Sequence, residues 1–287
     1  EIATVVPDGP MPESVGGIPF RSWADVPTNA KAWEKLVEQA TFDEPVFSGK
    51  KKPASGVVTI EPDGRVWVVS PNGQYGGYKN TFPKGKLEKV ELSFKANALK
   101  EAYEESGLQV ELIAYLCDAE RDTSTTRYYL ARRIGGNPAD MGWESQAVSL
   151  VPRNQLAAFA SHKNDHAVLD SLDRLLPVAP RATDLMQSSS LDSAKRILAT
   201  INGFRRRYGF WPTALRLDAH MTKMIKEKTL TVAAWLMLEA KMKVILIEEG
   251  TIYAEGGEQR FEYDADQTPP PDDERADIWI WGIPLMN

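Results

Sequence analysis

The sequence predicts an α/β domain followed by a smaller α+β domain, and three observations support this fold class. Between residues 57 and 176, short β-branched runs alternate with segments in which apolar residues recur at helical spacing. Residues 177–190 contain two prolines and three consecutive serines, a composition typical of a linker. After this stretch, helical and strand-like patterns begin again. A chain of 287 residues is long enough for two domains of ordinary size.

The α/β domain contains a predicted hairpin near its start. Two β-branched runs, at 57–60 and 66–69, are separated by Glu61-Pro-Asp-Gly64, which is a strong turn sequence. Before the hairpin, residues 30–40 predict a short helix and residues 49–56 predict a loop. After it, the pattern predicts a helix at 94–106, strands at 110–116, 127–133 and 148–151, and helices at 153–161 and 166–176.

The α+β domain is predicted to combine long helices with short strands. The helices are expected at 192–208 and 220–241, and the strands at 214–217, 244–247, 252–254 and 278–281. We therefore divide the chain into an N-terminal extension with a short helix (1–48), an α/β domain (49–177), a linker (178–190) and a small α+β domain of unknown role (191–287).

The bulk composition disfavours several classes of function. The net charge is −6, which argues against nucleic acid as a partner because its phosphates bind surfaces rich in Lys and Arg. The single cysteine, Cys117, cannot form a disulfide within the chain, so we expect a cytoplasmic protein with a buried, inert thiol. The longest apolar run is too short to span a membrane, and the first residues lack the pattern of a signal peptide.

The segment with the clearest indication of chemistry is Phe82–Leu108, a glycine-containing loop followed by a predicted helix. On that helix Glu101, Glu104 and Glu105 occupy positions i, i+3 and i+4, which places their carboxylates on one face. Three carboxylates so close repel one another. A hard divalent cation such as Mg²⁺ or Mn²⁺ would offset this repulsion, since it prefers oxygen ligands.

The alternative is that the three glutamates form an ordinary solvent-exposed helix face, because Glu pairs are common on such faces and have no function there. The surrounding residues favour the functional reading. Ser93 can cap the start of the helix and Gly107 can end it in a left-handed conformation. In the loop before it, Lys84 and Lys86 could contact phosphate oxygens. The joint pattern indicates a metal-dependent phosphate site.

This segment resembles the Nudix box, Gly-x5-Glu-x7-Arg-Glu-U-x-Glu-Glu-x-Gly-U, in which U is a bulky aliphatic residue. Gly85 and Glu91 match the first Gly and Glu of the box, and Glu101–Leu108 matches its second half in order. There are three departures. Lys100 replaces the Arg, Ala102 stands at an aliphatic position, and eight residues rather than seven separate Glu91 from Lys100.

The resemblance extends over roughly residues 50–177 and implies a Nudix-type fold, a mixed sheet sandwiched between helices. It also implies a metal site. Glu101, Glu104 and Glu105 would bind Mg²⁺ or Mn²⁺, with help from the backbone carbonyl of Gly85.

The implied reaction is attack of water on a phosphorus atom of a phosphoanhydride. A carboxylate would take the proton from that water, and Glu104 and Glu144 are the candidates for this general base. If Glu104 is the base, Glu144 would be an extra metal ligand. Lys100 would orient a neighbouring Glu. The resemblance therefore implies hydrolysis of a nucleoside diphosphate linked to another moiety, such as a dinucleoside polyphosphate or ADP-ribose.

The loop gives a hint about the substrate, which we expect to be a small phosphorylated molecule. Its Pro-Lys-Gly sequence is similar to that of diadenosine polyphosphate hydrolases and some inositol-pyrophosphate phosphohydrolases, and Lys84 and Lys86 suit a long phosphate chain. Tyr78 is a candidate substrate-binding residue, and Tyr75, Tyr78 or Trp67 could stack on a base. The alternative function is a non-catalytic Nudix-type module that senses a metabolite and signals through the C-terminal domain.

Other candidates have simpler explanations. His162, His166 and His220 do not have the spacing of a metal-ligand set. The basic run at 205–207 lies near a helix end, where cations interact favourably with the helix dipole. Two alternating tryptophans at 279 and 281 could form part of the core or a homodimer contact.

Overall fold

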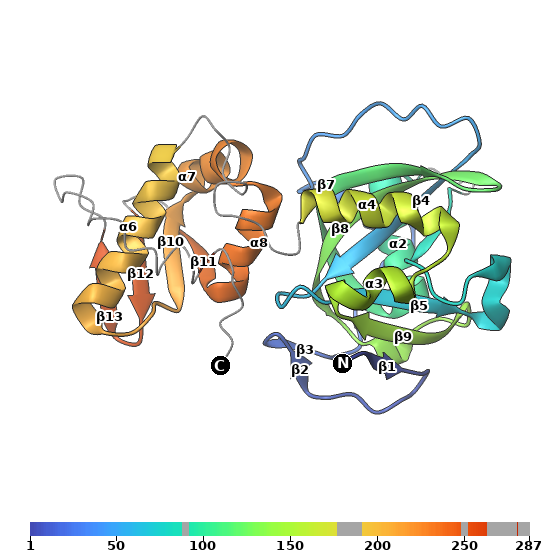
Figure 1. The fold of residues 1–287 in the computed structure, drawn as a ribbon, viewed down its shortest axis with the longest axis horizontal. Helices are drawn as coiled ribbons and strands as arrows, with labels where there is room; N and C mark the ends of the chain where they lie inside the picture. The colour runs from blue at the N-terminus through green and yellow to red at the C-terminus, as the bar shows by residue number, and fades with distance from the viewer. Residues whose placement is uncertain (88–91, 177–190, 248–251, 263–279, 281–287) are drawn as a thin grey trace. The chain divides into compact units, whose positions relative to one another are not determined.

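The computed structural model describes residues 1–87, 92–176, 191–247, 252–262 and 280, and the chain divides into two compact units (Figure 1). The first unit spans Glu1–Leu175 and the second Leu176–Asn287. None of the helices in these described ranges is long and apolar enough to cross a membrane.

The first unit is built around a seven-stranded mixed sheet. In sheet order, six of its strands are β1 (Ala3–Val5), β9 (Ser145–Val151), β5 (Val66–Pro71), β4 (Lys52–Ile60), β8 (Ser124–Gly136) and β7 (Leu108–Glu120). The seventh, β6 (Lys84–Lys86), pairs with β4 off this path. β4 and β8 are parallel, and the other neighbours are antiparallel.

Helices cover both faces of this sheet, which confirms the predicted α/β fold class. Helix α2 (Phe94–Ser106) packs on β4 and β7, with α1 (Ala30–Val37) beside it. Figure 1 shows α3 (Arg153–Phe159) and α4 (His166–Leu175) on the opposite face from α2. The alternation of side chains along β4 explains how both faces become buried: Val57 joins the apolar cluster under α2, while its buried neighbour Val58 points to the other side.

Helix α2 forms where the sequence predicts it, because its ends and its buried face are fixed by local residues. The hydroxyl of Ser93 accepts a hydrogen bond from the backbone N–H of Ala96 at the N-terminus. Gly107 ends the helix with a φ of 67°, a left-handed conformation that glycine adopts without strain. Ala98, Leu99 and Ala102 are buried in the core cluster, so the helix is held by packing as well as by its caps.

Residues 1–48, which the sequence sets apart as an extension, lie within the first unit. β1 adds to the edge of the sheet, and the short hairpin of β2 (Ser14–Val15) and β3 (Ile18–Pro19) is anchored by Arg133. The Arg133 guanidinium, fully buried, donates to backbone carbonyls of this hairpin and to the carboxylate of Glu61. A buried charge needs such partners, so the hairpin belongs to the packed structure.

Three predictions of local structure are wrong. Residues 84–86 were expected to lie in a loop, but they form β6, because they pair with β4. Residues 49–56 were expected to form a loop, but β4 begins at Lys52 because this stretch pairs with β8 on one side and β6 on the other. Residues 220–241 were expected to form one long helix. Instead α7 (Ala219–Met224) runs into a π-helical turn (Ile225–Thr229), and α8 (Val232–Lys241) starts anew with Thr231 as its cap.

The second unit is a small α+β domain, as predicted. Its four-stranded sheet has the order β11 (Lys243–Ile247), β10 (Ala214–Asp218), β12 (Tyr253–Gly256) and β13 (Gln259–Glu262). β10 and β11 are parallel, whereas β12 is antiparallel to both of its neighbours. Helix α6 (Leu191–Tyr208) packs on β12 and β13. The strand predicted at 278–281 lies outside the described residues apart from Ile280.

Candidate active site

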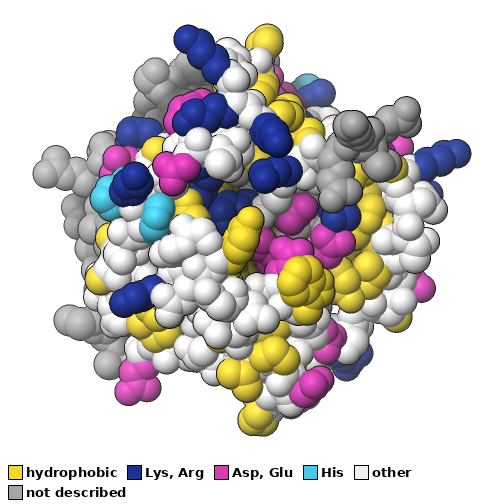
Figure 2. Space-filling view, turned by 90° about the vertical axis from the view of Figure 1, so that its right-hand side faces the viewer, with side chains coloured by type: hydrophobic (Ala, Val, Ile, Leu, Met, Phe, Trp, Pro, Cys, Tyr) yellow, Lys and Arg dark blue, Asp and Glu magenta, His cyan; other side chains and the backbone are white. Residues whose placement is uncertain are grey.

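A cavity of about 1040 Å³ opens in the first unit beside α2. Nine of the residues that the sequence predicts for the site line it: Tyr78, Lys84, Gly85, Lys86, Lys100, Glu101, Glu104, Glu105 and Glu144. Glu91, which matches the first Glu of the Nudix box, lies outside the described residues. On the face drawn in Figure 2, acidic side chains gather beside basic ones around a hollow.

Glu101 lies against the backbone of Gly85. A Cβ atom added at Gly85 would come closer than 3.0 Å to the Glu101 carboxyl group, so any other residue at position 85 would displace that carboxylate. Asn97 fixes the loop from the helix side, since its amide donates to the Gly85 carbonyl (3.3 Å) and to the Ser55 hydroxyl (3.0 Å). The sequence thus brings a carboxylate of α2 against the backbone of Gly85 in β6.

Burial and mutual repulsion act on the carboxylates of α2. Burial, followed by the charge of Glu105, raises the pKa of Glu101 to about 8. Burial also raises the pKa of Glu105 to about 7, against the opposing effect of Lys84, whose backbone N–H donates to Glu105 (3.2 Å). A cation placed between these two carboxylates would relieve the repulsion, so their chemistry fits a hard divalent metal ion.

Glu104 faces a different partner. Its side chain is half exposed, and its carboxylate accepts a hydrogen bond from the Lys100 ammonium (2.5 Å), which also lies 3.9 Å from Glu101. Within the described ranges, no three acidic, His or Cys side chains are already arranged to hold a metal ion. The bond to Lys100 engages one oxygen of Glu104, and a carboxylate has a second oxygen that could bind a metal ion together with Glu101 and Glu105.

The opposite wall of the cavity comes from two loops that are tied together. Asn72 begins the short 3-10 helix Asn72–Gly77 and is bonded to the segment that precedes β9. Its backbone N–H donates to the Glu144 carbonyl (2.7 Å), and its side-chain amide donates to the Trp143 carbonyl (3.2 Å). Tyr75 and Trp143 both line the cavity with highly exposed rings, 83% and 82% accessible. Neither is needed for the core.

The structure distinguishes among the aromatic residues that were candidates for stacking on a base. Trp67 is buried in the core and donates to Glu61 (2.6 Å), so the suggestion that it stacks on a base is wrong. Tyr78 lines the cavity, but His162 lies 4.0 Å from its ring and the Lys84 ammonium 4.9 Å from it. Burial lowers the pKa of Lys84.

Three further residues of the cavity carry no local sequence signal: Arg121, Trp143 and Asn164. Arg121 follows β7 in the hairpin turn to β8, and its guanidinium pairs with Asp165, 44 positions later. A pairing so distant in sequence has no spacing pattern that could reveal it. Trp143 directly precedes Glu144, so it could have been considered with it.

A comparison with protein-family models matches residues 50–172 to the NUDIX domain. Residues 50–172 therefore form a Nudix domain. The resemblance seen in the sequence is confirmed, and so is the Nudix-type mixed sheet between helices. The cavity described above lies inside the Nudix domain, since all its lining residues fall between positions 54 and 164.

Solved Nudix structures are similar to part of the chain. An ADP-ribose pyrophosphatase from Streptococcus suis 89-1591 is 21% identical over 42% of this chain and 92% of its own, with a TM-score of 0.35. A C. elegans Ap4A hydrolase is 19% identical over 42% and 95%, with a TM-score of 0.35. A NUDIX hydrolase from Nitrosomonas europaea is 19% identical over 46% and 73%, with a TM-score of 0.36. No curated protein matches the chain.

Proposed function

We propose that this protein is a divalent-metal-dependent pyrophosphohydrolase that cleaves a phosphoanhydride bond in a nucleoside diphosphate linked to another moiety. The Nudix domain supports the general class of reaction. The observation that carries the proposal is the contact of the Glu101 carboxylate with Gly85, beside Glu105, in a cavity that also holds Lys84 and Lys86. Carboxylates for a metal and cations for phosphate thus share one cavity.

The metal ion, when bound, would polarise the phosphoanhydride and acidify the attacking water. Glu101, Glu104, Glu105 and the Gly85 carbonyl would hold it. Water attacks one phosphorus, the bridging P–O bond breaks towards the leaving phosphate, and a carboxylate accepts the proton of the water. Glu144 and Glu104 are the candidates for that base.

Lys84 and Lys86 would bind the phosphate oxygens, while Lys100 would position Glu104. Their charges offset the negative charge that accumulates as the anhydride breaks. Tyr75 and Trp143 would contact a base or another flat group, because both rings are open to the cavity and unused by the core. Tyr78 is less suited to stacking, since His162 and Lys84 lie against its ring.

A substrate panel tests the proposal. The protein is incubated with dinucleoside polyphosphates, ADP-ribose, NADH, nucleoside triphosphates and inositol pyrophosphates, with Mg²⁺, with Mn²⁺ and with EDTA, and products are followed by phosphorus NMR. We expect metal-dependent turnover of at least one substrate. We also expect Glu104→Gln to lower kcat by about 100-fold or more, as the loss of an acid–base group or metal ligand does.

Glu38→Gln is the matched control, because Glu38 is exposed at the end of α1 and outside the cavity. It should retain full activity. If no substrate is turned over but one binds with a metal-dependent affinity, the alternative of a metabolite-sensing module gains support. If Glu104→Gln keeps full activity in a protein that does turn over substrate, the assignment of the site is wrong.

A further inference from the structure

A second polar cluster lies in the same cavity, centred on Arg121. The guanidinium of Arg121 donates to the hydroxyl of Tyr78 (2.7 Å), to the hydroxyl of Tyr128 (2.6 Å) and to the carboxylate of Asp165 (2.5 Å). Its side chain is only 5% exposed and that of Asp165 is fully buried. Asn164 completes the cluster by donating its amide to the Tyr78 hydroxyl (2.8 Å). Four chain segments therefore cooperate to hold one arginine at the cavity wall.

The charges of this cluster do not cancel. Lys84 contacts both sets of residues, since its backbone N–H donates to Glu105 and its ammonium lies 4.9 Å from the Tyr78 ring. The Arg121 guanidinium lies 5.3 Å from the same ring, so two cations lie against Tyr78. Asp165 offsets only one of them, and Glu105 is the carboxylate we assign to the metal. With a metal on Glu105, this side of the cavity carries an excess positive charge.

One donor at this side of the cavity is left unused. The Tyr78 oxygen already accepts from Arg121 and Asn164, so its own hydrogen is left to donate to another group. An anionic acceptor in the cavity would accept that hydrogen. Among the described residues, the Nε of Arg121 and the Oδ2 of Asp165 are both buried without a hydrogen-bond partner, so they concern the Arg121–Asp165 pair itself. A guanidinium held rigidly by three partners is well prepared to bind a phosphate.

A chain of contacts joins Glu105 to Lys84, Lys84 to Tyr78 and Tyr78 to Arg121. We propose that Arg121, Lys84 and Tyr78 form an anion subsite for a phosphate beyond the two that are joined by the scissile anhydride, and that Asp165 positions Arg121 for it. This inference rests on the proposed function for the place of the scissile bond. It narrows the substrate class to molecules with a third phosphate, whether in a linear polyphosphate chain or as a separate phosphoryl group.

Anion binding without metal tests the subsite independently of hydrolysis. Inorganic tripolyphosphate is titrated into the full-length protein in EDTA by isothermal calorimetry. We expect Arg121→Gln to weaken binding at least tenfold and Arg121→Lys to recover part of the affinity. Arg132→Gln, on the neighbouring strand β8 and outside the cavity, is the control and should bind as the wild type does. Equal affinity of the wild type and Arg121→Gln would overturn the proposal.

Turnover then separates the subsite from a merely structural role. For a diphosphate-linked substrate such as ADP-ribose, Arg121→Gln should change kcat/KM less than threefold. For diadenosine tetraphosphate, a nucleoside triphosphate or an inositol pyrophosphate, whichever is turned over, it should lower kcat/KM at least tenfold, mainly through KM. Asp165→Asn should act in the same direction but less strongly. An equal loss for both substrate classes would contradict the proposal.

Two outcomes keep the proposals distinct. If no substrate is hydrolysed but tripolyphosphate binding depends on Arg121, the proposed function fails and the anion subsite stands. If substrates are hydrolysed but neither hydrolysis nor tripolyphosphate binding depends on Arg121, the proposed function stands and the anion subsite fails. Should circular dichroism show that Arg121→Gln does not fold, Tyr78→Phe and Asn164→Ala take its place. Tyr78→Phe removes the two hydrogen bonds that the Tyr78 hydroxyl accepts, and Asn164→Ala removes one of them. Each should weaken tripolyphosphate binding at least threefold, and unchanged binding in both would overturn the subsite.

Discussion

Gly85 is the residue whose identity the site constrains most directly. Its missing side chain leaves the space that the Glu101 carboxylate occupies. We predict that Gly85→Ala lowers kcat/KM by about 100-fold, because a displacement of about 1 Å in a catalytic group has an effect of this size. The fold should be retained, so the measurement is turnover of the substrate found in the panel together with a thermal unfolding curve.

A double mutant shows whether the loss of kcat/KM in Gly85→Ala is caused by the displacement of Glu101. In a Glu101→Gln background, adding Gly85→Ala should reduce activity by less than about threefold, since the group that the methyl would displace has already lost its function. If the two losses simply multiply, Gly85 acts through something other than Glu101.

At the residue scale, the carboxylates of α2 could be predicted because their spacing is local. Glu101, Glu104 and Glu105 lie within one and a half turns of a helix, and the helix itself has its cap and its terminating glycine in the sequence. Arg121 could not be predicted, because its partners come from positions 78, 128 and 165. Lys100, which the resemblance expects to orient a neighbouring Glu, pairs with Glu104 and also lies 3.9 Å from Glu101.

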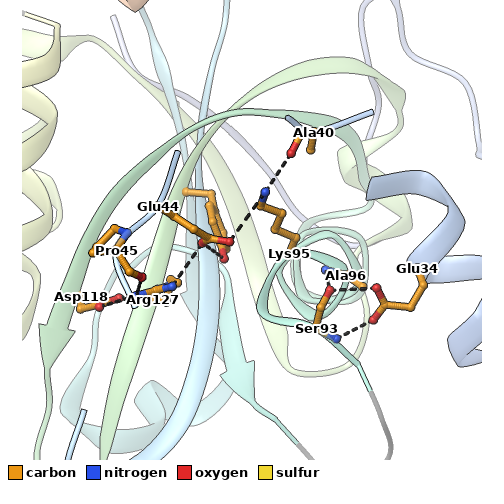
Figure 3. A network of polar contacts seen from close by, with 10 residues as sticks. Glu34, Ala40, Glu44, Pro45, Ser93, Lys95, Ala96, Asp118 and Arg127 are labelled. Carbon is orange, nitrogen blue, oxygen red and sulfur yellow. Dashed lines mark hydrogen bonds and ion pairs between the residues drawn. The ribbon is translucent and has the colours of Figure 1, made fainter. Parts of the chain in front are cut away.

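Among the elements, the 40–47 segment shows how an irregular stretch is fixed to the sheet (Figure 3). The Arg127 guanidinium, 3% exposed on β8, donates to the Pro45 carbonyl (2.9 Å) and makes two hydrogen bonds to Asp118 (2.7 and 2.8 Å). Glu44 joins Arg127 (3.2 Å) and the Lys95 ammonium of α2 (3.7 Å). One arginine thus ties this segment to the strands, and Glu44 ties it to the site helix.

We predict that Arg127→Gln lowers the free energy of unfolding of the first unit by about 2–3 kcal/mol, the usual loss when hydrogen bonds to charged groups are removed from a buried position. Denaturant titration measures the loss, and hydrogen exchange should show faster exchange of amides in the 40–47 segment. Arg132→Gln is the control, because its pair with Glu111 is more exposed, with 31% and 47% accessible side chains, and should contribute less than about 1 kcal/mol. Equal effects of both substitutions would contradict this account.

Helices and strands that depend on the local sequence pattern were predicted well. Those that depend on pairing with distant segments were predicted poorly. The start of β4 reads as a Gly-Lys-rich loop, yet it becomes a strand because both β6 and β8 offer partners. Residues 225–231 contain no glycine or proline that would mark the end of a helix, and the sequence predicts one helix there. The π-helical turn and the extended backbone of Leu230 interrupt it instead, and Thr231 caps the next helix.

The whole molecule combines a Nudix domain with a second, α+β unit. All residues that line the cavity lie between positions 54 and 164, and the first compact unit ends at Leu175. The split into two units was expected from the linker composition at 177–190, although the role of the second unit has no sequence signal. A fragment that lacks the second unit tests whether that unit takes part in catalysis.

We predict that a fragment of residues 1–176 folds and hydrolyses the substrate with a kcat within about threefold of the full chain. The reason is that α4, which packs on β7, is complete at Leu175 and that the core and the cavity are formed without later residues. Circular dichroism and the turnover assay measure this, with a Glu104→Gln version of the fragment as the inactive control. A folded fragment that binds tripolyphosphate but has lost more than tenfold of its kcat would show that the second unit acts on the catalytic step, and would favour a regulatory role for that unit.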